Sequence, residues 1–238
     1  MAKSKKEIRE LVTRVRRMIN SPWKRNTLLQ DKAYWNMMCS SLDAIEDTEV
    51  ALESYCQLEN IRDDGIQYIL IYGVLQALIV QQDATKNLAE SLGLKWETKD
   101  VLKEIRDIRN DAAGHPTKRS RKKEDAYNFI SRGTMSKSGF QIMTSYRDSR
   151  PDEFKQCDLF KLIEGQRTAL TTVLSDVLSN LYSEQKEHMN EFRGRRIQDL
   201  IPSTLDYPLS KIKEASAARK TITDTNTEGR TINIPTSH

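Results

Sequence analysis

An arginine, an asparagine and a histidine lie close together in the stretch IRDIRNDAAGHPTKR, residues 105–119. Arg109 and Asn110 are adjacent, and His115 follows directly after Gly114. The imidazole of a histidine titrates near neutral pH, so it can take or give a proton. The guanidinium fork of an arginine matches the oxygens of a phosphate group. These residue types at this spacing therefore point to the cleavage of a phosphodiester bond.

RNA cleavage of this kind removes a proton from the 2′-hydroxyl and delivers one to the leaving 5′-oxygen, while negative charge gathers on the phosphate oxygens. His115 suits either proton transfer, Arg109 suits the developing charge, and Asn110 can orient the phosphate or the histidine. One copy of the motif supplies only one histidine. Separate acid and base roles therefore require a second copy, most simply from the other protomer of a homodimer.

The sequence before the histidine predicts the helix that positions these groups. Residues 99–113 form an amphipathic pattern with Val101, Ile105, Ile108 and Ala112 on the buried side. Gly114 is expected to end the helix in the left-handed conformation, and Pro116 prevents the helix from resuming. On an unbroken helix, the side chains of Arg109 and His115 would point in different directions around the helix axis. A break at Gly114 lets the imidazole turn toward the guanidinium.

Helices are predicted over most of the remaining chain. Helical periodicity is found in residues 4–19, 28–58, 66–92 and 158–192, and the helix over 66–92 is apolar on nearly all sides in its first half. Two runs rich in strand-forming residues predict a β-hairpin between about Ala126 and Tyr146. The fold class is therefore an all-α helical bundle with a small β-hairpin appendage.

This domain is expected to span residues 1–192. Short helices are expected within 193–220, and residues 221–238 have almost no core-forming pattern and are expected to be a disordered tail.

The number and spacing of the cysteines argue against a metal-binding function. The 238 residues carry a net charge of +4 and three widely spaced cysteines, Cys39, Cys56 and Cys157, with no CxxC or Cys/His spacing for a metal. We therefore expect neither a metal nor a cofactor.

Lys and Arg recur through the first 17 residues, so no secretory signal is expected. The most apolar run, residues 66–80, is short for a membrane span and contains Gln67 and Gln76. A cytoplasmic protein without membrane contact is predicted.

Positive charge is concentrated directly after the motif. Between Lys118 and Asp125 there are five basic and two acidic residues. Lys118, Arg119, Arg121 and Lys122 are the candidate RNA-binding residues, because lysine and arginine contacts to phosphates position a nucleic acid. The alternative is a solvated loop with no ligand.

The stretch RNDAAGH resembles the Arg-polar-x(3–5)-His motif of the HEPN superfamily, helical proteins of which many are metal-independent ribonucleases. The preceding YGVLQALIVQQDATKNLAESLG, residues 72–93, is similar to the helix before the motif in several members. The resemblance covers about Ile66 to Thr117. It implies an RNA-cleaving homodimer with a composite active site, in which Arg109 and His115 are contributed twice.

The resemblance also implies a role as a toxin or in antiviral, abortive-infection defence, with a defence-system or antitoxin partner. Family toxins that are silenced by nucleotidyl transfer carry a tyrosine two residues after the histidine, where this chain has Thr117. An antitoxin that works by that route is therefore not expected.

Less specific interpretations remain open at the level of sequence. His115 can bond to the last carbonyls of the helix, where a cation suits the helix dipole. Arg109 can pair with Glu104, Asp107 or Asp111 as an ordinary surface ion pair. The whole chain can be a non-catalytic RNA-binding or scaffold module within a defence complex, or a structural helical subunit.

Overall fold

A computed structural model of the protein describes residues 2–59, 61–117, 119–121, 124–148, 150–191 and 193. The chain divides into two units, Met1–Gln185 and Lys186–His238. In the second unit only 186–191 and 193 are described. The short helices predicted within 193–220, apart from Arg193, and the tail predicted from 221 lie outside the described residues.

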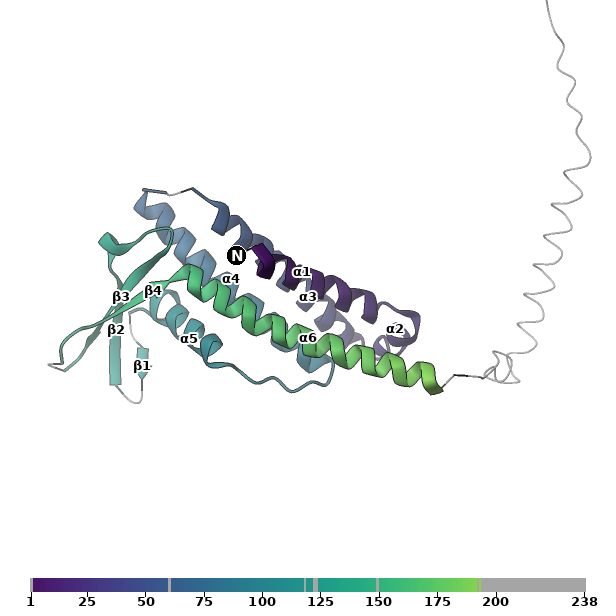
Figure 1. Ribbon diagram of the computed structural model, residues 1–238. Helices are drawn as coiled ribbons and strands as arrows, with labels where there is room; N and C mark the ends of the chain where they lie inside the picture. The colour runs from purple at the N-terminus through teal and green to yellow at the C-terminus, as the bar shows by residue number, and fades with distance from the viewer. Residues whose placement is uncertain are drawn as a thin grey trace, which may run out of the picture. The chain divides into compact units, whose positions relative to one another are not determined.

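The first unit is mostly helical, with a small antiparallel sheet (Figure 1). Its helices are α1 (Ala2–Ile19), α2 (Pro22–Leu28), α3 (Lys32–Gln57), α4 (Asp64–Ser91), α5 (Asp100–Arg109) and α6 (Leu159–Glu191), which continues into the second unit. A helix-dominated fold with a small β element is therefore confirmed. The prediction of one helix over 28–58 was wrong, because Asp31 starts a new helix: its carboxylate accepts the N–H groups of Ala33 and Tyr34.

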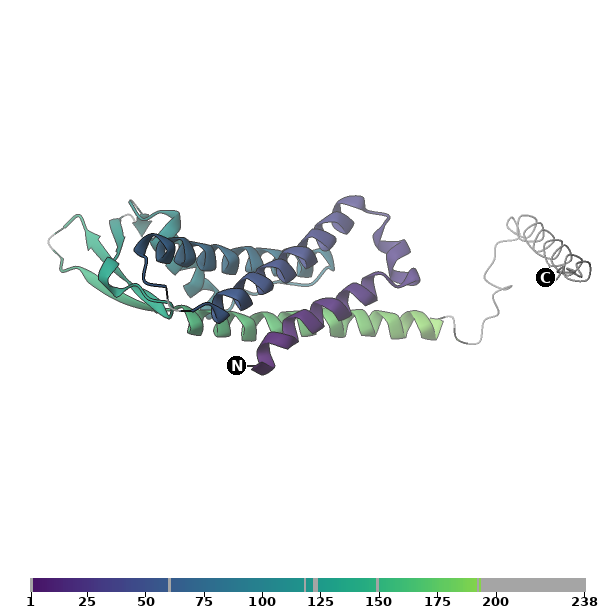
Figure 2. The same cartoon turned by 90° about the horizontal axis from the view of Figure 1, so that it is seen from above.

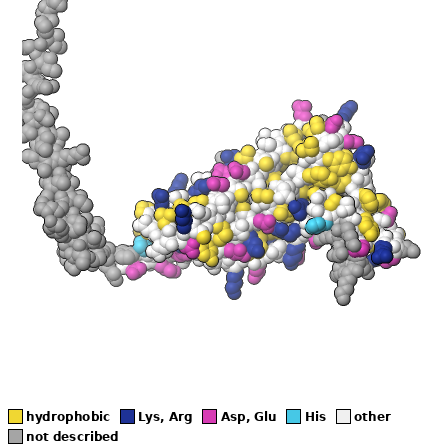
Figure 3. All heavy atoms as spheres, turned by 180° about the vertical axis from the view of Figure 1, so that it is seen from behind, with side chains coloured by type: hydrophobic (Ala, Val, Ile, Leu, Met, Phe, Trp, Pro, Cys, Tyr) yellow, Lys and Arg dark blue, Asp and Glu magenta, His cyan; other side chains and the backbone are white. Residues whose placement is uncertain are grey.

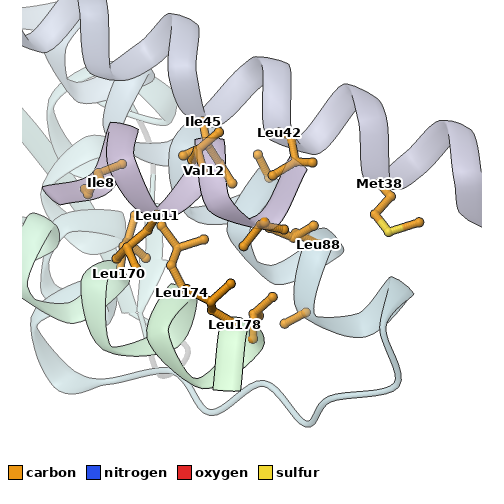
Figure 4. Close-up of a cluster of buried hydrophobic side chains, with 14 of the residues drawn as sticks. Ile8, Leu11, Val12, Met38, Leu42, Ile45, Leu88, Leu170, Leu174 and Leu178 are labelled. Carbon is orange, nitrogen blue, oxygen red and sulfur yellow. The ribbon is translucent and has the colours of Figure 1, made fainter. Parts of the chain in front are cut away.

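Two apolar clusters hold the helices together. In the first, side chains from α1, α3, α4 and α6 meet, and Figure 4 shows Val12, Ile45, Leu88 and Leu174 pointing toward one another. The second cluster joins α3, α4, α5 and the start of α6 to the sheet, with Leu75, Leu78, Ile105, Ile108 and Ile163 among its buried members.

A buried polar layer separates the two clusters. Glu49 on α3 pairs with Arg167 on α6, and both side chains are fully buried. Gln81 on α4 donates to Glu49 at 3.1 Å and accepts from Gln166 at 2.8 Å, and Gln166 in turn accepts from Gln82. Attraction to Glu49 and Glu164 more than offsets the effect of burial and raises the pKa of Arg167. Such a layer fixes how the three long helices align, because a shift would leave buried polar groups without partners.

The sheet lies at one end of these helices (Figure 2). Its order is β1 (Arg119–Arg121), β2 (Glu124–Ile130), β3 (Gly139–Tyr146) and β4 (Glu153–Asp158), with all neighbours antiparallel. The pairing of Ala126 with Tyr146 confirms the predicted hairpin. The sheet is larger than predicted, because short β1 and β4 flank the hairpin. Phe140, Ile142 and Cys157 are buried in the second apolar cluster, so one face of the sheet covers the helices.

Candidate functional site

The motif lies on a π-helical turn, Asn110–Gly114, that directly continues α5. The N–H of His115 donates to the carbonyl of Asn110 at 2.7 Å, five residues back, and His115 itself leaves the helix with φ −141° and ψ 53°. The prediction of a left-handed Gly114 was wrong. The helix widens by one residue before it ends, and among the described glycines only Gly93 has a positive φ, 73°. Single π turns of this kind occur frequently at functional sites.

Two amides hold the guanidinium of Arg109. The side-chain oxygen of Gln76 on α4 accepts hydrogen bonds from Nε at 3.3 Å and from Nη2 at 3.0 Å, and Asn110 Oδ1 accepts one from Nη1 at 3.1 Å. No carboxylate of the described residues pairs with Arg109, whereas nearby Glu104 pairs with Lys155. The alternative of an ordinary surface ion pair is therefore not the arrangement found among the described residues. The guanidinium is held in place by uncharged amides, so no carboxylate of the described residues competes with a ligand for it.

Gly114 lies directly against this guanidinium. A Cβ atom built at Gly114 would be 2.8 Å from Arg109 Nη1 and 3.2 Å from Asn110 Oδ1. The guanidinium and the Asn110 amide therefore contact the backbone of the residue that precedes His115. The widened turn brings the arginine, the asparagine and the backbone entering the histidine to one place.

The side chain of His115 is exposed and has no hydrogen bond within the described part of the chain. The alternative of a structural helix-end histidine needs a bond to the last carbonyls, and the structure gives the imidazole none there. The imidazole is accessible to a substrate.

The segment after the histidine joins the sheet. The N–H of Asn128 on β2 donates to the carbonyl of Pro116 at 2.8 Å. Of the predicted RNA-binding residues, Arg119 and Arg121 belong to β1, and Lys118 and Lys122 lie outside the described residues. RNA contact by these four residues remains a prediction.

An acidic cavity of about 410 Å³ lies between α5 and the sheet. Its lining includes five carboxylates and two lysines: Asp100, Glu104, Asp107, Asp111, Glu153, Lys103 and Lys155. One of these lysines, Lys155, is 3.1 Å from Glu104. The net negative charge of this cavity repels a polyanion, so nucleic acid is not expected to enter it.

An apolar surface covers the adjoining part of α3 and α4, which we call the α3/α4 face. Its exposed apolar residues are Val50, Leu58, Ile66, Ile69 and Tyr72, and a cavity of about 330 Å³ beside them is lined by Leu52, Gly73, Val74 and Ala77 among others. Figure 3 shows hydrophobic side chains gathered on one side of the molecule toward the end that carries the sheet. Ile69, Tyr72, Gly73 and Gln76 follow the i, i+3, i+4, i+7 spacing of one helix side, so the face leads directly to the partner of Arg109.

Sequence reasoning missed the role of Gln76. Its signal was a polar residue inside the apolar run 66–80, which was noted only as an argument against a membrane span. It also missed Asn128, a buried β2 residue whose Nδ2 has no acceptor in the part of the chain that the structure describes. An asparagine at an inward position of a strand is the corresponding signal.

Comparisons with protein-family models, with curated proteins and with solved structures found no significant match. Among the described residues, α4 is long and apolar enough to span a membrane, a property that it shares with core helices of soluble proteins.

Proposed function

We propose that the protein is a metal-independent endoribonuclease of the HEPN type that cleaves RNA through attack of a 2′-hydroxyl. One observation carries the proposal: a guanidinium that pairs with no carboxylate of the described residues is fixed by two amides against the backbone that leads into an exposed histidine. A fixed guanidinium against the backbone that precedes an exposed imidazole suits a reaction that develops charge on phosphate and moves two protons.

In the proposed reaction, the 2′-oxygen attacks the adjacent phosphorus as a histidine takes its proton. The bond from phosphorus to the 5′-oxygen breaks, and a second histidine gives that oxygen a proton. The products are a 2′,3′-cyclic phosphate and a free 5′-hydroxyl. Arg109 stabilises the negative charge on the non-bridging oxygens, and Asn110 positions the guanidinium through its Oδ1.

The second histidine is proposed to come from a second copy of the chain, joined through the α3/α4 face. Apolar side chains such as Ile69, which is 70% exposed, are unfavourable in water and mark a binding surface. The same side of α4 leads to Gln76 and Arg109, so a dimer formed there places two copies of the motif beside each other. A two-fold interface of this kind uses the same residues from both partners.

The biological role proposed with this activity is that of a cytoplasmic toxin or antiviral defence effector, regulated by a partner. This part rests on the resemblance of residues 66–117 to the HEPN superfamily. The reaction as proposed uses no metal and no cofactor.

The test uses the purified full-length chain, a mixed RNA pool and EDTA. The wild type is expected to cleave, and His115→Ala and Arg109→Ala are each expected to lower the rate at least about 100-fold, because each removes a group that acts in the transition state. Asn87→Ala, at an exposed position of α4, is the matched control and keeps the wild-type rate. RNA binding without cleavage by the wild type would instead support a non-catalytic RNA-binding or scaffold module.

A further inference from the structure

Gln76 on α4 contacts Arg109 with only one end of its amide. Its side-chain oxygen Oε1 accepts two hydrogen bonds from the guanidinium, from Nε at 3.3 Å and from Nη2 at 3.0 Å. A guanidinium donates hydrogen bonds and never accepts them, so the amide oxygen must be the atom that faces it. The amide nitrogen Nε2 is therefore turned away from Arg109. Within the part of the chain that the structure describes, Nε2 donates to no acceptor.

Asn110 repeats this arrangement at the other terminal nitrogen of the guanidinium. Its Oδ1 accepts a hydrogen bond from Nη1 at 3.1 Å, and its Nδ2 has no acceptor among the described residues. The bonds to the two amides use three of the five N–H groups of Arg109. One N–H on Nη1 and one on Nη2 remain. The free groups that Gln76, Arg109 and Asn110 offer to a ligand are therefore mainly hydrogen-bond donors.

The carboxylates closest to Arg109 in the sequence lie on the sheet side of α5. Asp107 and Asp111 line the acidic cavity between α5 and the sheet, whereas Arg109 contacts Gln76 on α4. The donor groups and the acidic groups thus occupy different sides of the same helix. Several N–H donors around one positive charge suit an oxyanion, because each oxygen can accept more than one hydrogen bond.

The contact with Arg109 also makes the Gln76 amide a better donor. Hydrogen bonds in a chain polarise one another, so an amide whose oxygen accepts from a charged group donates more strongly through its N–H groups. Nε2 and Oε1 are bonded to the same carbon, and Oε1 is 3.0 Å from Nη2. Neighbouring oxygens of one phosphate can therefore contact both Nε2 and the guanidinium.

We propose that Gln76 is a phosphate-binding residue of the candidate active site. Its Nε2 donates to one non-bridging oxygen of the phosphate whose other non-bridging oxygen is bound by Arg109. This inference rests on the proposed function, and it adds a substrate contact from a second helix. Gln76 thus has two roles, because its oxygen positions the guanidinium and its nitrogen touches the substrate.

The experiment measures binding by fluorescence anisotropy on the full-length chain in EDTA. The probe is a labelled mixed-sequence RNA of twelve nucleotides in which every ribose is 2′-O-methylated, so the proposed reaction cannot cleave it. Gln76→Ala is expected to weaken binding about tenfold, because a hydrogen bond to a charged oxygen is lost. Gln30→Ala is the matched control, at an exposed position between α2 and α3, and it is expected to bind like the wild type.

A double variant separates contact with the phosphate from positioning of Arg109. A residue that only holds the guanidinium has nothing left to act on in Arg109→Ala, so its own removal would have no further effect. The proposal predicts that adding Gln76→Ala to Arg109→Ala weakens binding at least about threefold further. Equal affinities of Arg109→Ala and the double variant would overturn the proposal and leave Gln76 as a positioning residue. Unchanged affinity in Gln76→Ala, or a wild type that does not bind the probe, would overturn it as well.

The result is distinguishable from the outcome for catalysis, which is measured on unmodified RNA. Binding that depends on Gln76 in a protein that cleaves no RNA would refute the ribonuclease and keep the phosphate site. Cleavage that depends on His115, with binding that ignores Gln76, would refute the phosphate contact and keep the ribonuclease. Melting temperatures and sedimentation of the variants are expected to match those of the wild type, because Gln76 is exposed on α4.

Discussion

At the scale of single residues, the candidate site combines residues that are close together in the sequence with a residue from a distant helix. Arg109, Asn110 and His115 could be selected from the sequence because their chemistry and spacing are local. The amide of Gln76 could not, because it comes from a different helix 33 positions earlier. The left-handed Gly114 was predicted from the usual way helices end, and the π turn replaced it.

Gly114→Ala is expected to lower RNA cleavage at least about tenfold and to change stability by less than about 1 kcal/mol. The new methyl group would lie 2.8 Å from Arg109 Nη1, so the end of the Arg109 side chain must move away from the two amides that hold it. Rates and melting temperatures of the variant provide the measurement. Gly133→Ala is the control, since a Cβ there has no neighbour within 4 Å. Wild-type cleavage by Gly114→Ala would show that the position of the guanidinium does not matter.

At the scale of helices and strands, periodicity predicted most of the elements. The apolar spacing gave α4, α5 and α6 within a few residues, and alternating strand formers gave the β2–β3 hairpin. The polar layer was not predictable, because the charges of Glu49 and Arg167 become partners only when helices 118 positions apart are packed. β4 was missed because four of its six residues are exposed and lack an apolar pattern.

Tyr55 links a helix to the sheet and makes that link sensitive to alkaline pH. Its hydroxyl donates to the carbonyl of Lys137, and burial raises its pKa to about 12. The folded pKa exceeds the unfolded value of about 10, so this contribution to stability is complete below pH 10 and is lost as the pH rises toward 12.

Melting temperatures measured from pH 8 to pH 11.5 test this link. The wild type is expected to lose stability more steeply above pH 10 than Tyr55→Phe, which has no phenol to ionise. Tyr34→Phe, at an exposed tyrosine, should follow the wild type. Parallel curves for the wild type and Tyr55→Phe would contradict the prediction.

At the scale of the whole molecule, the sequence predicted a helical fold but not the location of its binding surfaces. The sequence showed the first half of the helix over 66–92 to be apolar on nearly all sides, and the structure divides these residues: Ile71, Val74 and Leu75 are buried, whereas Ile69 and Tyr72 are exposed. Which residues remain exposed depends on what packs against each side of α4, and that information is distributed over α3, α5 and α6.

Ile69→Glu is expected to convert the proposed dimer to a monomer and to abolish cleavage, because a charge at the centre of an apolar interface must be desolvated. Sedimentation or light scattering at several protein concentrations gives the oligomeric state. Tyr34→Glu adds the same charge at an exposed aromatic position at the start of α3 and should preserve both dimer and activity. A wild-type monomer that cleaves RNA would disprove the composite site.

The central claim is tested most directly by the chemical identity of the cleavage products. RNA fragments made by the wild type in EDTA are analysed by mass spectrometry, and the nucleotide before each cut is then replaced by its 2′-deoxy form in a synthetic substrate. The account predicts 2′,3′-cyclic phosphate and 5′-hydroxyl ends, no cut at the deoxy position, and no cut by His115→Ala. Fragments with 5′-phosphate ends, or cleavage that persists at the deoxy nucleotide, would contradict it.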